Sequence, residues 1–195
     1  MSENTQRAVA NASGSSILPA YFITFTTYGT WLHGRHTGSI DRKHNIPGTP
    51  FLPADPAREA EMRANMRQKP YLLDEPRRAV ALRTLVEVAR HRRWILHAAH
   101  VRSNHVHILV TASDSPEKVM NDFKAWMSRR LREAFNESAD RDRWTQHGST
   151  RWLNTISQLE AAWNYIVDGQ GEPMAVYDAR TQSPSLTLPA HEGKS

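Results

Sequence analysis

The sequence predicts an α+β fold of the ferredoxin-like split β-α-β type: an antiparallel sheet with two helices on one face and an additional C-terminal helix. Aromatic and β-branched side chains fill residues 21–27, as is typical of a strand. Apolar residues recur at every fourth position from Val119 to Phe135, which indicates the buried face of a helix. The predicted elements follow one another as strand, helix, strand, strand, helix and strand, which is the order this fold requires, and a further helix comes after them.

The remaining elements rest on local signals. Ser115 followed by Pro116 is a typical helix start, and Gly169 stands where a cap would end the last helix. In chain order, the sequence predicts a helix at about residues 55–68, a helix beginning near Pro76, strands at residues 94–101 and 105–111 joined by a turn at residues 102–104, a helix from about residue 114, a strand at residues 150–153, and a helix from near Ser157 to near Asp168.

One domain is expected, over residues 19–174. Residues 1–18 are rich in Ser, Asn, Ala and Gly, and residues 175–195 are rich in Pro, Ser and Thr, so both are predicted to be weakly ordered tails. An insertion dense in Gly, Pro and His covers about residues 29–74. Because ordered domains rarely carry so long a connection without a role, this insertion is predicted to contact substrate.

The chain is basic and contains no cysteine. Its formal net charge is +5 and its pI is about 9.8, which favours an anionic partner. Arginines cluster near tryptophans, as at Arg129 and Trp126, and such groups can contact phosphates and stack on unpaired bases. For Trp126, core packing is favoured over base stacking. The absence of cysteine excludes disulfides and thiolate metal sites. With no signal peptide and no membrane-spanning run visible, we expect a cytoplasmic, nucleoid-associated protein with no membrane partner.

Two histidines alternate with apolar residues in the segment that follows Asn104. Because side chains alternate along a strand, His105 and His107 are expected on one face and Val106 on the other. Two neutral imidazoles can converge on a cation and leave coordination positions open for a phosphate oxygen. Surface or hydrogen-bonded histidines are the alternative, since a His-x-His pair alone is weak evidence. A histidine-triad hydrolase would need a third histidine where the chain has Leu109, and a closed zinc site would need two further ligands.

Tyr165 lies on the predicted last helix, to one side of the apolar stripe that contains Trp163 and Ile166. Such a tyrosine can be a half-buried packing residue. It can also attack a phosphodiester, and a metal ion on a phosphate oxygen would assist a phenol that is protonated at neutral pH. The resulting phosphotyrosine ester conserves the energy of the cleaved linkage, so the same site could rejoin DNA ends.

Four segments complete the pattern: residues 27–32 (TYGTWL), 102–107 (RSNHVH), 148–153 (GSTRWL) and 165–172 (YIVDGQGE). Together they resemble the HUH single-tyrosine transposases of the IS200 type, and above all the REP-associated tyrosine transposases. The resemblance covers residues 21–174. It is far more specific than either the histidine pair or the tyrosine alone.

The resemblance implies a Mg²⁺ or Mn²⁺ ion at His105 and His107, and Tyr165 as the catalytic nucleophile that forms a 5′-phosphotyrosine and frees a 3′-OH. IS200-type enzymes use a glutamine four residues after the tyrosine as a further metal ligand. That position here is Gly169, and the next residue, Gln170, is the candidate third ligand. The implied partner is single-stranded DNA with REP-like hairpins, bound by a monomer or a homodimer.

Four further residues are candidate DNA contacts. Arg102 and Asn104 precede the histidine strand and can contact phosphate or support the metal ligands. His147 and Arg151 lie around the predicted last strand. The candidate DNA contacts are Arg102, Asn104, His147 and Arg151. By contrast, His97 and His100 on the neighbouring strand are expected to pack or to form hydrogen bonds rather than to bind metal.

These residues are compatible with two classes of function. The first is a metal-dependent, single-stranded DNA endonuclease and strand transferase, a tyrosine transposase of the HUH type. The second is a non-catalytic, transposase-derived DNA-binding protein or repressor. The presence of both histidines and of Tyr165 favours the enzyme. A general RNA-binding ferredoxin-like module is less favoured, because it would expose aromatic side chains on the central strands, where this chain has histidines.

Overall fold

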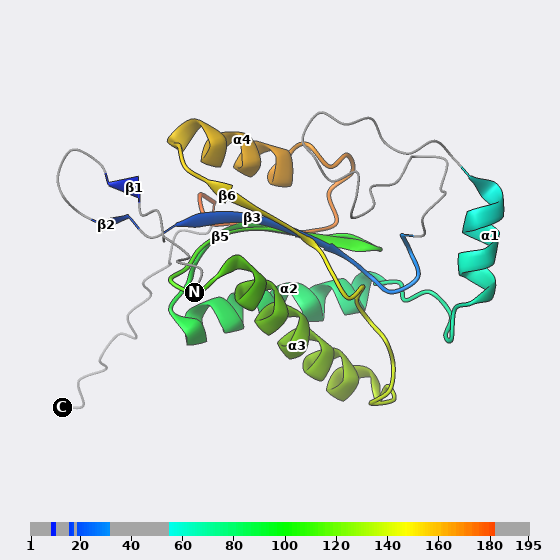
Figure 1. Cartoon of the computed structure of the whole chain (residues 1–195). Helices are drawn as coiled ribbons and strands as arrows, with labels where there is room; N and C mark the ends of the chain where they lie inside the picture. Colours follow the sequence, from blue (N-terminus) through cyan, green and yellow to red (C-terminus); the bar gives the residue numbers. More distant parts are fainter. Residues whose placement is uncertain (1–8, 11–15, 18, 32–54, 182–195) are drawn as a thin grey trace, which may run out of the picture.

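The computed structural model describes residues 9–10, 16–17, 19–31 and 55–181. Its elements are β1 (Val9–Ala10), β2 (Ser16–Ile17), β3 (Ala20–Thr26), α1 (Pro56–Ala64), α2 (Glu75–Arg92), β4 (Ile95–Val101), β5 (His105–Thr111), α3 (Pro116–Phe135), β6 (Ser149–Leu153), α4 (Ile156–Val167) and β7 (Ala175–Asp178). Five strands form an antiparallel sheet in the order β6-β3-β5-β4-β7. Helices α2 and α3 cover one face and α4 covers the other (Figure 1). The predicted α+β fold with an additional C-terminal helix is confirmed.

Polar side chains start the three helices that cover the sheet. Asp74, Ser115 and Thr155 each accept a hydrogen bond from the backbone N–H three residues later. Helices α2 and α3 end at Arg93 and Asn136, whose φ angles of 58° and 48° are left-handed and turn the chain away from the helix. None of the helices in the described ranges has the length and apolar character that a bilayer span requires.

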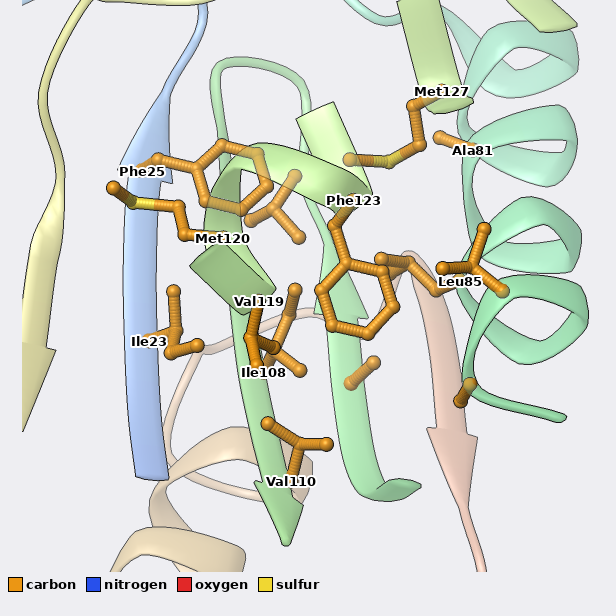
Figure 2. Packing of buried hydrophobic residues seen from close by; sticks show 14 of the residues in the cluster. Ile23, Phe25, Ala81, Leu85, Ile108, Val110, Val119, Met120, Phe123 and Met127 are labelled. Carbon is orange, nitrogen blue, oxygen red and sulfur yellow. The ribbon is translucent and has the colours of Figure 1, made fainter. Parts of the chain in front are cut away.

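The sheet face beneath α2 and α3 is apolar. Val106, Ile108 and Val110 of β5 point to this face, and each is 0% exposed. They belong to one core cluster with Phe123 and Met127 of α3, whose side chains Figure 2 shows together with those of the strands and of α2. The predicted stripe at every fourth residue of α3 is therefore confirmed as the buried face of that helix.

The opposite face is apolar at one end only. Ala98 and Leu109 of the sheet pack there against Ala162, Trp163 and Ile166 of α4. Figure 1 shows α4 lying across this face, on the far side of the sheet from α2 and α3. Toward the start of β5 the same face carries polar side chains, and that end holds the candidate site.

The prediction of a weakly ordered tail from residue 175 onward is wrong for Ala175–Asp178. These residues form β7, which pairs antiparallel with β4 at the edge of the sheet, with Tyr177 opposite Ala99. Four residues are too short to show a strand pattern in sequence, and the pairing with β4 stabilises them. Within the predicted N-terminal tail, β1 pairs with β2. The remainder of that tail and residues 182–195 lie outside the described residues.

The two ends of the predicted insertion lie close together, beside the turn that precedes β5. The backbone N–H of Tyr71 donates to the carbonyl oxygen of Tyr28 at 2.9 Å, and that of Leu73 donates to the carbonyl oxygen of Ser103 at 2.8 Å. The turn before β5 therefore lies beside the point where the insertion rejoins the fold. Residues 32–54 lie outside the described residues, so substrate contact by the insertion stays a prediction.

Candidate active site

The register between β3 and β5 places two threonines against the two histidines. Thr24 lies opposite His107 and Thr26 opposite His105, so these four side chains share the face that α4 covers. The two imidazole centroids are 4.7 Å apart, with the ring planes at 72°. The prediction that the two histidines point to one face is confirmed, while Val106 between them is buried in the opposite core.

Each imidazole is held through its Nδ1 atom. Nδ1 of His105 lies 2.7 Å from Oδ1 of Asn104, and Nδ1 of His107 lies 2.8 Å from Oγ1 of Thr24. A carboxamide oxygen can only accept, so Nδ1 of His105 carries the proton and donates. The Thr24 hydroxyl can accept in the same way, and in that tautomer Nε2 of both rings is an unprotonated acceptor.

The Gln170 side chain joins this pair. Its carboxamide works to raise the pKa of both imidazoles, as a nearby acceptor oxygen does, so the atom that faces the rings is Oε1. The carboxamide Nε2 points the other way and donates to the carbonyl oxygen of Tyr165 at 3.1 Å. Two ring nitrogens and one amide oxygen are thereby brought together from β5 and the end of α4.

The end of α4 explains why residue 170, rather than 169, occupies this place. The carbonyl oxygen of Asn164 accepts from the N–H of Asp168 at 2.8 Å and from the N–H of Gly169 at 3.1 Å, so the last turn is one residue wider than an α-helical turn. A Cβ at Gly169 would lie 2.8 Å from the carbonyl oxygen of Tyr165, so the wide turn requires glycine. The prediction that Gly169 caps α4 is corrected, because Asp168 is the C-cap.

Burial keeps both imidazoles neutral. Removal from water lowers the pKa of His107 to about 3, and the neighbouring His105 adds to this effect. Burial also lowers the pKa of His105, with a further lowering from Arg102. Both rings are therefore neutral at pH 7, which is the form of histidine that binds metal ions.

The donor set fits a cation. When both imidazole protons are on Nδ1, Nε2 of His105, Nε2 of His107 and Oε1 of Gln170 form a set of three acceptor atoms with no proton donor among them. Imidazole nitrogen suits ions such as Zn²⁺, Fe²⁺ and Ni²⁺, and an amide carbonyl oxygen suits Mg²⁺ and Mn²⁺, so this mixed set is compatible with a divalent ion of either group. The described part of the chain contains no cluster of three or more His, Cys, Asp or Glu, so it does not contain the ligands of a closed structural zinc site.

Tyr165 stands beside this donor set. Helix α4 buries Trp163 and Ile166 against the sheet, and Tyr165 projects from its side with 47% of its surface exposed. The tyrosine ring centroid lies 5.5 Å from that of His107. A phenol at this place is open to a substrate and close to the atoms that can bind a cation.

Sequence reasoning missed Phe22 and Thr24. The Phe22 ring stacks on His107 at 5.7 Å with an interplanar angle of 22°, and meets Tyr165 edge-on at 5.9 Å. Both residues occupy alternate positions of the first predicted strand, on the face opposite Ile23. That alternation was visible in the sequence, but the pairing with β5 that brings them to the histidines was not.

The neighbouring histidines have other roles. His100 is fully buried: its Nδ1 donates to the carbonyl oxygen of Ile166 at 3.0 Å, and its Nε2 accepts from the N–H of Met174 at 3.2 Å. Both ring nitrogens are occupied, so His100 joins the end of α4 to the segment before β7. Nε2 of His97 lies 2.9 Å from Oγ1 of Thr111. The predicted hydrogen-bonded roles of His97 and His100 are confirmed.

Two of the predicted DNA contacts lie near the turn before β5. Oδ1 of Asn104 is engaged by His105, as described above. Nη1 of Arg102 donates to the carbonyl oxygen of Glu172 at 3.1 Å. This contact ties the turn to the segment that follows Gln170, so Arg102 lies at the border of the site.

The other two predicted DNA contacts lie in and before β6. Arg151 is exposed on this strand, and its guanidinium carbon is 5.8 Å from the centroid of Phe22, which itself contacts Tyr165. His147 is exposed in the preceding loop, where Nζ of Lys124 donates to its carbonyl oxygen at 3.2 Å. Arg151 therefore borders the site directly, and His147 lies on the loop that leads into the same strand.

Together these features define a class of protein: an α+β fold with two neutral histidines, a glutamine and an exposed tyrosine gathered on the sheet face beneath its last helix. The model of the family described as "Transposase IS200 like" matches residues 62–164, which is more than half of the 195 residues. The match includes both histidines and ends immediately before Tyr165. The chain belongs to the family of IS200-like transposases.

Two solved structures resemble the chain at low sequence identity. One is described as a REP-associated tyrosine transposase bound to a REP hairpin, with 13% identity, a TM-score of 0.42, and coverage of 85% of this chain and 70% of that chain. The other, from Deinococcus radiodurans R1 and named as a transposase, has 16% identity, a TM-score of 0.41, and coverage of 83% and 97%. The assignment rests on the family match rather than on these values. No curated protein matches the sequence.

Proposed function

We propose that this transposase-family chain cleaves and rejoins hairpin-forming single-stranded DNA, with Tyr165 as the nucleophile and a Mg²⁺ or Mn²⁺ ion at His105, His107 and Gln170. One observation supports the proposal most strongly. The Tyr165 ring lies 5.5 Å from His107, which lies 4.7 Å from His105, so the phenol and the cation-binding atoms form a single cluster.

The proposed reaction is an exchange of bonds at phosphorus. Oη of Tyr165 forms a bond to phosphorus, and the bond between phosphorus and the 3′ oxygen breaks. The phenol loses its proton to solvent and the departing 3′ oxygen takes one up, so the products are a 5′-phosphotyrosine and a free 3′-OH. Attack of a 3′-OH on the ester reverses the exchange and releases Tyr165, which is how the same site rejoins DNA without another energy source.

A divalent ion at the three acceptor atoms would polarise a nonbridging phosphate oxygen and offset the charge that develops there. The chain itself supplies neutral ligands whose orientation is fixed. His107 is 6% exposed and Phe22 stacks on it at 5.7 Å, so one side of its ring is shielded from water. The exposed side of the cluster carries Tyr165, which gives a DNA strand access to the phenol.

The proposed partner follows from the sequence resemblance and from charge. Arg151 and Arg102 border the site, and the formal net charge of +5 complements a phosphate backbone. His147 completes the proposed DNA-contacting set, while Asn104, whose Oδ1 lies 2.7 Å from Nδ1 of His105, acts through that histidine. The proposal holds for a monomer and for a homodimer, and it places the protein with the DNA of the cell.

Covalent capture tests the proposal. The chain is incubated with Mn²⁺ and with single strands that carry the hairpins flanking its own gene, and adducts are resolved on denaturing gels. Tyr165→Phe removes the attacking oxygen, so we expect the adduct to disappear while hairpin binding persists. Tyr177→Phe is the matched control, because it removes the same hydroxyl from a tyrosine of β7. The ring of Tyr177 packs against the core on the other face of the sheet.

Two results would overturn the proposal: an adduct formed by Tyr165→Phe, or an adduct formed by the unmodified chain in excess EDTA. Tight hairpin binding without any adduct, in Mg²⁺ and in Mn²⁺, would instead support a non-catalytic DNA-binding protein. Tyr177→Phe should form the adduct at the rate of the unmodified chain.

A further inference from the structure

The groups that orient the two histidines come from different parts of the chain and are distinct from the three acceptor atoms. We propose that Thr24 and Asn104 are positioning residues, which hold the proton of each imidazole on Nδ1 and thereby keep both Nε2 atoms free to bind a cation with Gln170. The inference rests on the proposed metal-binding role of His105 and His107, and it assigns Asn104 to the histidine rather than to DNA.

For His107, the choice of tautomer decides what the ring can do with Gln170. With the proton on Nδ1, the ring donates to Oγ1 of Thr24 at 2.8 Å and offers an unprotonated Nε2 to a cation. With the proton on Nε2, the ring would donate to Oε1 of Gln170 instead, and that hydrogen bond would close the site. Because His107 is 6% exposed, water gives little support to an unpartnered Nδ1, and Thr24 supplies the partner.

For His105, the positioning group is itself fixed by both ends of the insertion. The carbonyl oxygen of Asn104 accepts from the N–H of Thr27 at 2.8 Å and from Oγ1 of Thr27 at 3.2 Å, and Thr27 is 0% exposed. The adjacent Ser103 carbonyl accepts from the N–H of Leu73 at 2.8 Å. Asn104 is therefore held by Thr27, just before the insertion, and its neighbour Ser103 by Leu73, near the end of the insertion, while Oδ1 of Asn104 orients His105.

The strand offers a matched control. Thr26 lies two residues from Thr24, on the same face and opposite His105, but its Oγ1 lies 3.1 Å from Oγ1 of Thr145 rather than near an imidazole. Thr24→Val and Thr26→Val remove the same hydroxyl from equivalent strand positions, and each loses one side-chain hydrogen bond. A difference between the two variants therefore reports on the histidine and not on the strand.

The test measures Mn²⁺ alone binding to the full chain, by electron paramagnetic resonance or calorimetry. We expect Thr24→Val to weaken Mn²⁺ binding by about 10- to 100-fold, and Thr24→Ser to restore it, because serine keeps the accepting oxygen. Thr26→Val should bind Mn²⁺ like the unmodified chain. Asn104→Leu should weaken binding to a similar degree, and Asn104→Asp, which keeps an acceptor oxygen, should not.

Nitrogen-15 NMR of the metal-free chain gives a second readout that uses neither metal nor DNA. Both histidines should carry the proton on Nδ1, and Thr24→Val should move the proton of His107 to Nε2. An unchanged tautomer together with unchanged Mn²⁺ affinity in Thr24→Val would overturn the inference, as would equal weakening in Thr26→Val. If the proposed DNA cleavage failed, these results would still decide the positioning role, because neither measurement involves DNA.

Discussion

The two faces of β5 differ in the neighbours that their side chains need: one face needs apolar packing and the other needs hydrogen-bond partners. Val106, Ile108 and Val110 face α2 and α3, are 0% exposed, and need only apolar neighbours of the right shape. His105 and His107 face the other way, and each needs a specific polar partner, because a buried polar atom without one is unfavourable. The apolar face can be stabilised by many different packing contacts, whereas each histidine on the polar face depends on one specific hydrogen-bond partner.

Stability depends mainly on one of these two faces, and the proposed function on the other. Burial of apolar side chains beneath α2 and α3 stabilises the fold, and loss of one of them leaves a cavity. The polar end of the α4 face contributes little apolar burial and holds the groups proposed to act on DNA. We therefore expect substitutions on the two faces to affect the free energy of unfolding to very different degrees.

The largest effect on stability is expected from Phe123→Ala on the apolar side. Phe123 is 0% exposed and its ring lies 5.3 Å from that of Trp94, so truncation leaves a cavity in the main core. We expect the free energy of unfolding to fall by about 3–5 kcal/mol in urea denaturation. A fall of less than about 1 kcal/mol would mean that this face is not the principal source of stability.

A smaller effect is expected from His100→Leu, on the α4 face. Leucine is close in size but leaves the buried carbonyl of Ile166 and the N–H of Met174 without the imidazole. The expected fall in the free energy of unfolding is about 1–3 kcal/mol. Hydrogen exchange should also quicken at the end of α4, and unchanged exchange there would contradict the linking role of His100.

Lys124→Met probes a buried charge on the apolar side. Burial lowers the pKa of Lys124 from 10.5 to about 8, so between these values the unfolded chain holds a proton that the folded chain has released. Stability contributed by this group therefore rises as the pH increases from about 8 to about 10.5. We expect the unmodified chain to gain on the order of 1 kcal/mol over Lys124→Met across this range in urea denaturation. Parallel pH profiles for the two proteins would refute this.

The smallest effect on stability is expected from Tyr165→Phe. Tyr165 is 47% exposed, so loss of its hydroxyl should change the free energy of unfolding by less than about 0.5 kcal/mol. The same substitution is expected to remove the covalent adduct. A large loss of stability in thermal denaturation would mean that Tyr165 is a packing residue. It would contradict the expectation that the polar face contributes little to stability.

Much of the fold could be predicted because it rests on local patterns. The alternation in β5 correctly predicted which side chains share a face, and the apolar spacing correctly predicted the buried side of α3. The strand β7 could not be predicted, since four residues carry too little pattern and their pairing partner β4 lies far away in sequence. Short elements held by distant pairing have no local signature.

The candidate site was predictable in its residue types but not in its contacts. His105, His107 and Tyr165 could be selected from spacing and resemblance, and the structure brings them together. The contacts of Thr24 and Phe22 with His107 depend on the register between β3 and β5, which the sequence does not state. Only the folded sheet reveals which side chains support the histidines.

The wide last turn of α4 bears on how relatives of this chain can be recognised. Because the N–H of Gly169 reaches back to Asn164, the glutamine arrives one residue later along the sequence and still faces the histidines. A search pattern that counted four residues from the tyrosine to a glutamine would pass over this chain. A pattern that also allowed five, with glycine directly before the glutamine, would retain it, because a close approach to the Tyr165 carbonyl leaves no room for a larger residue.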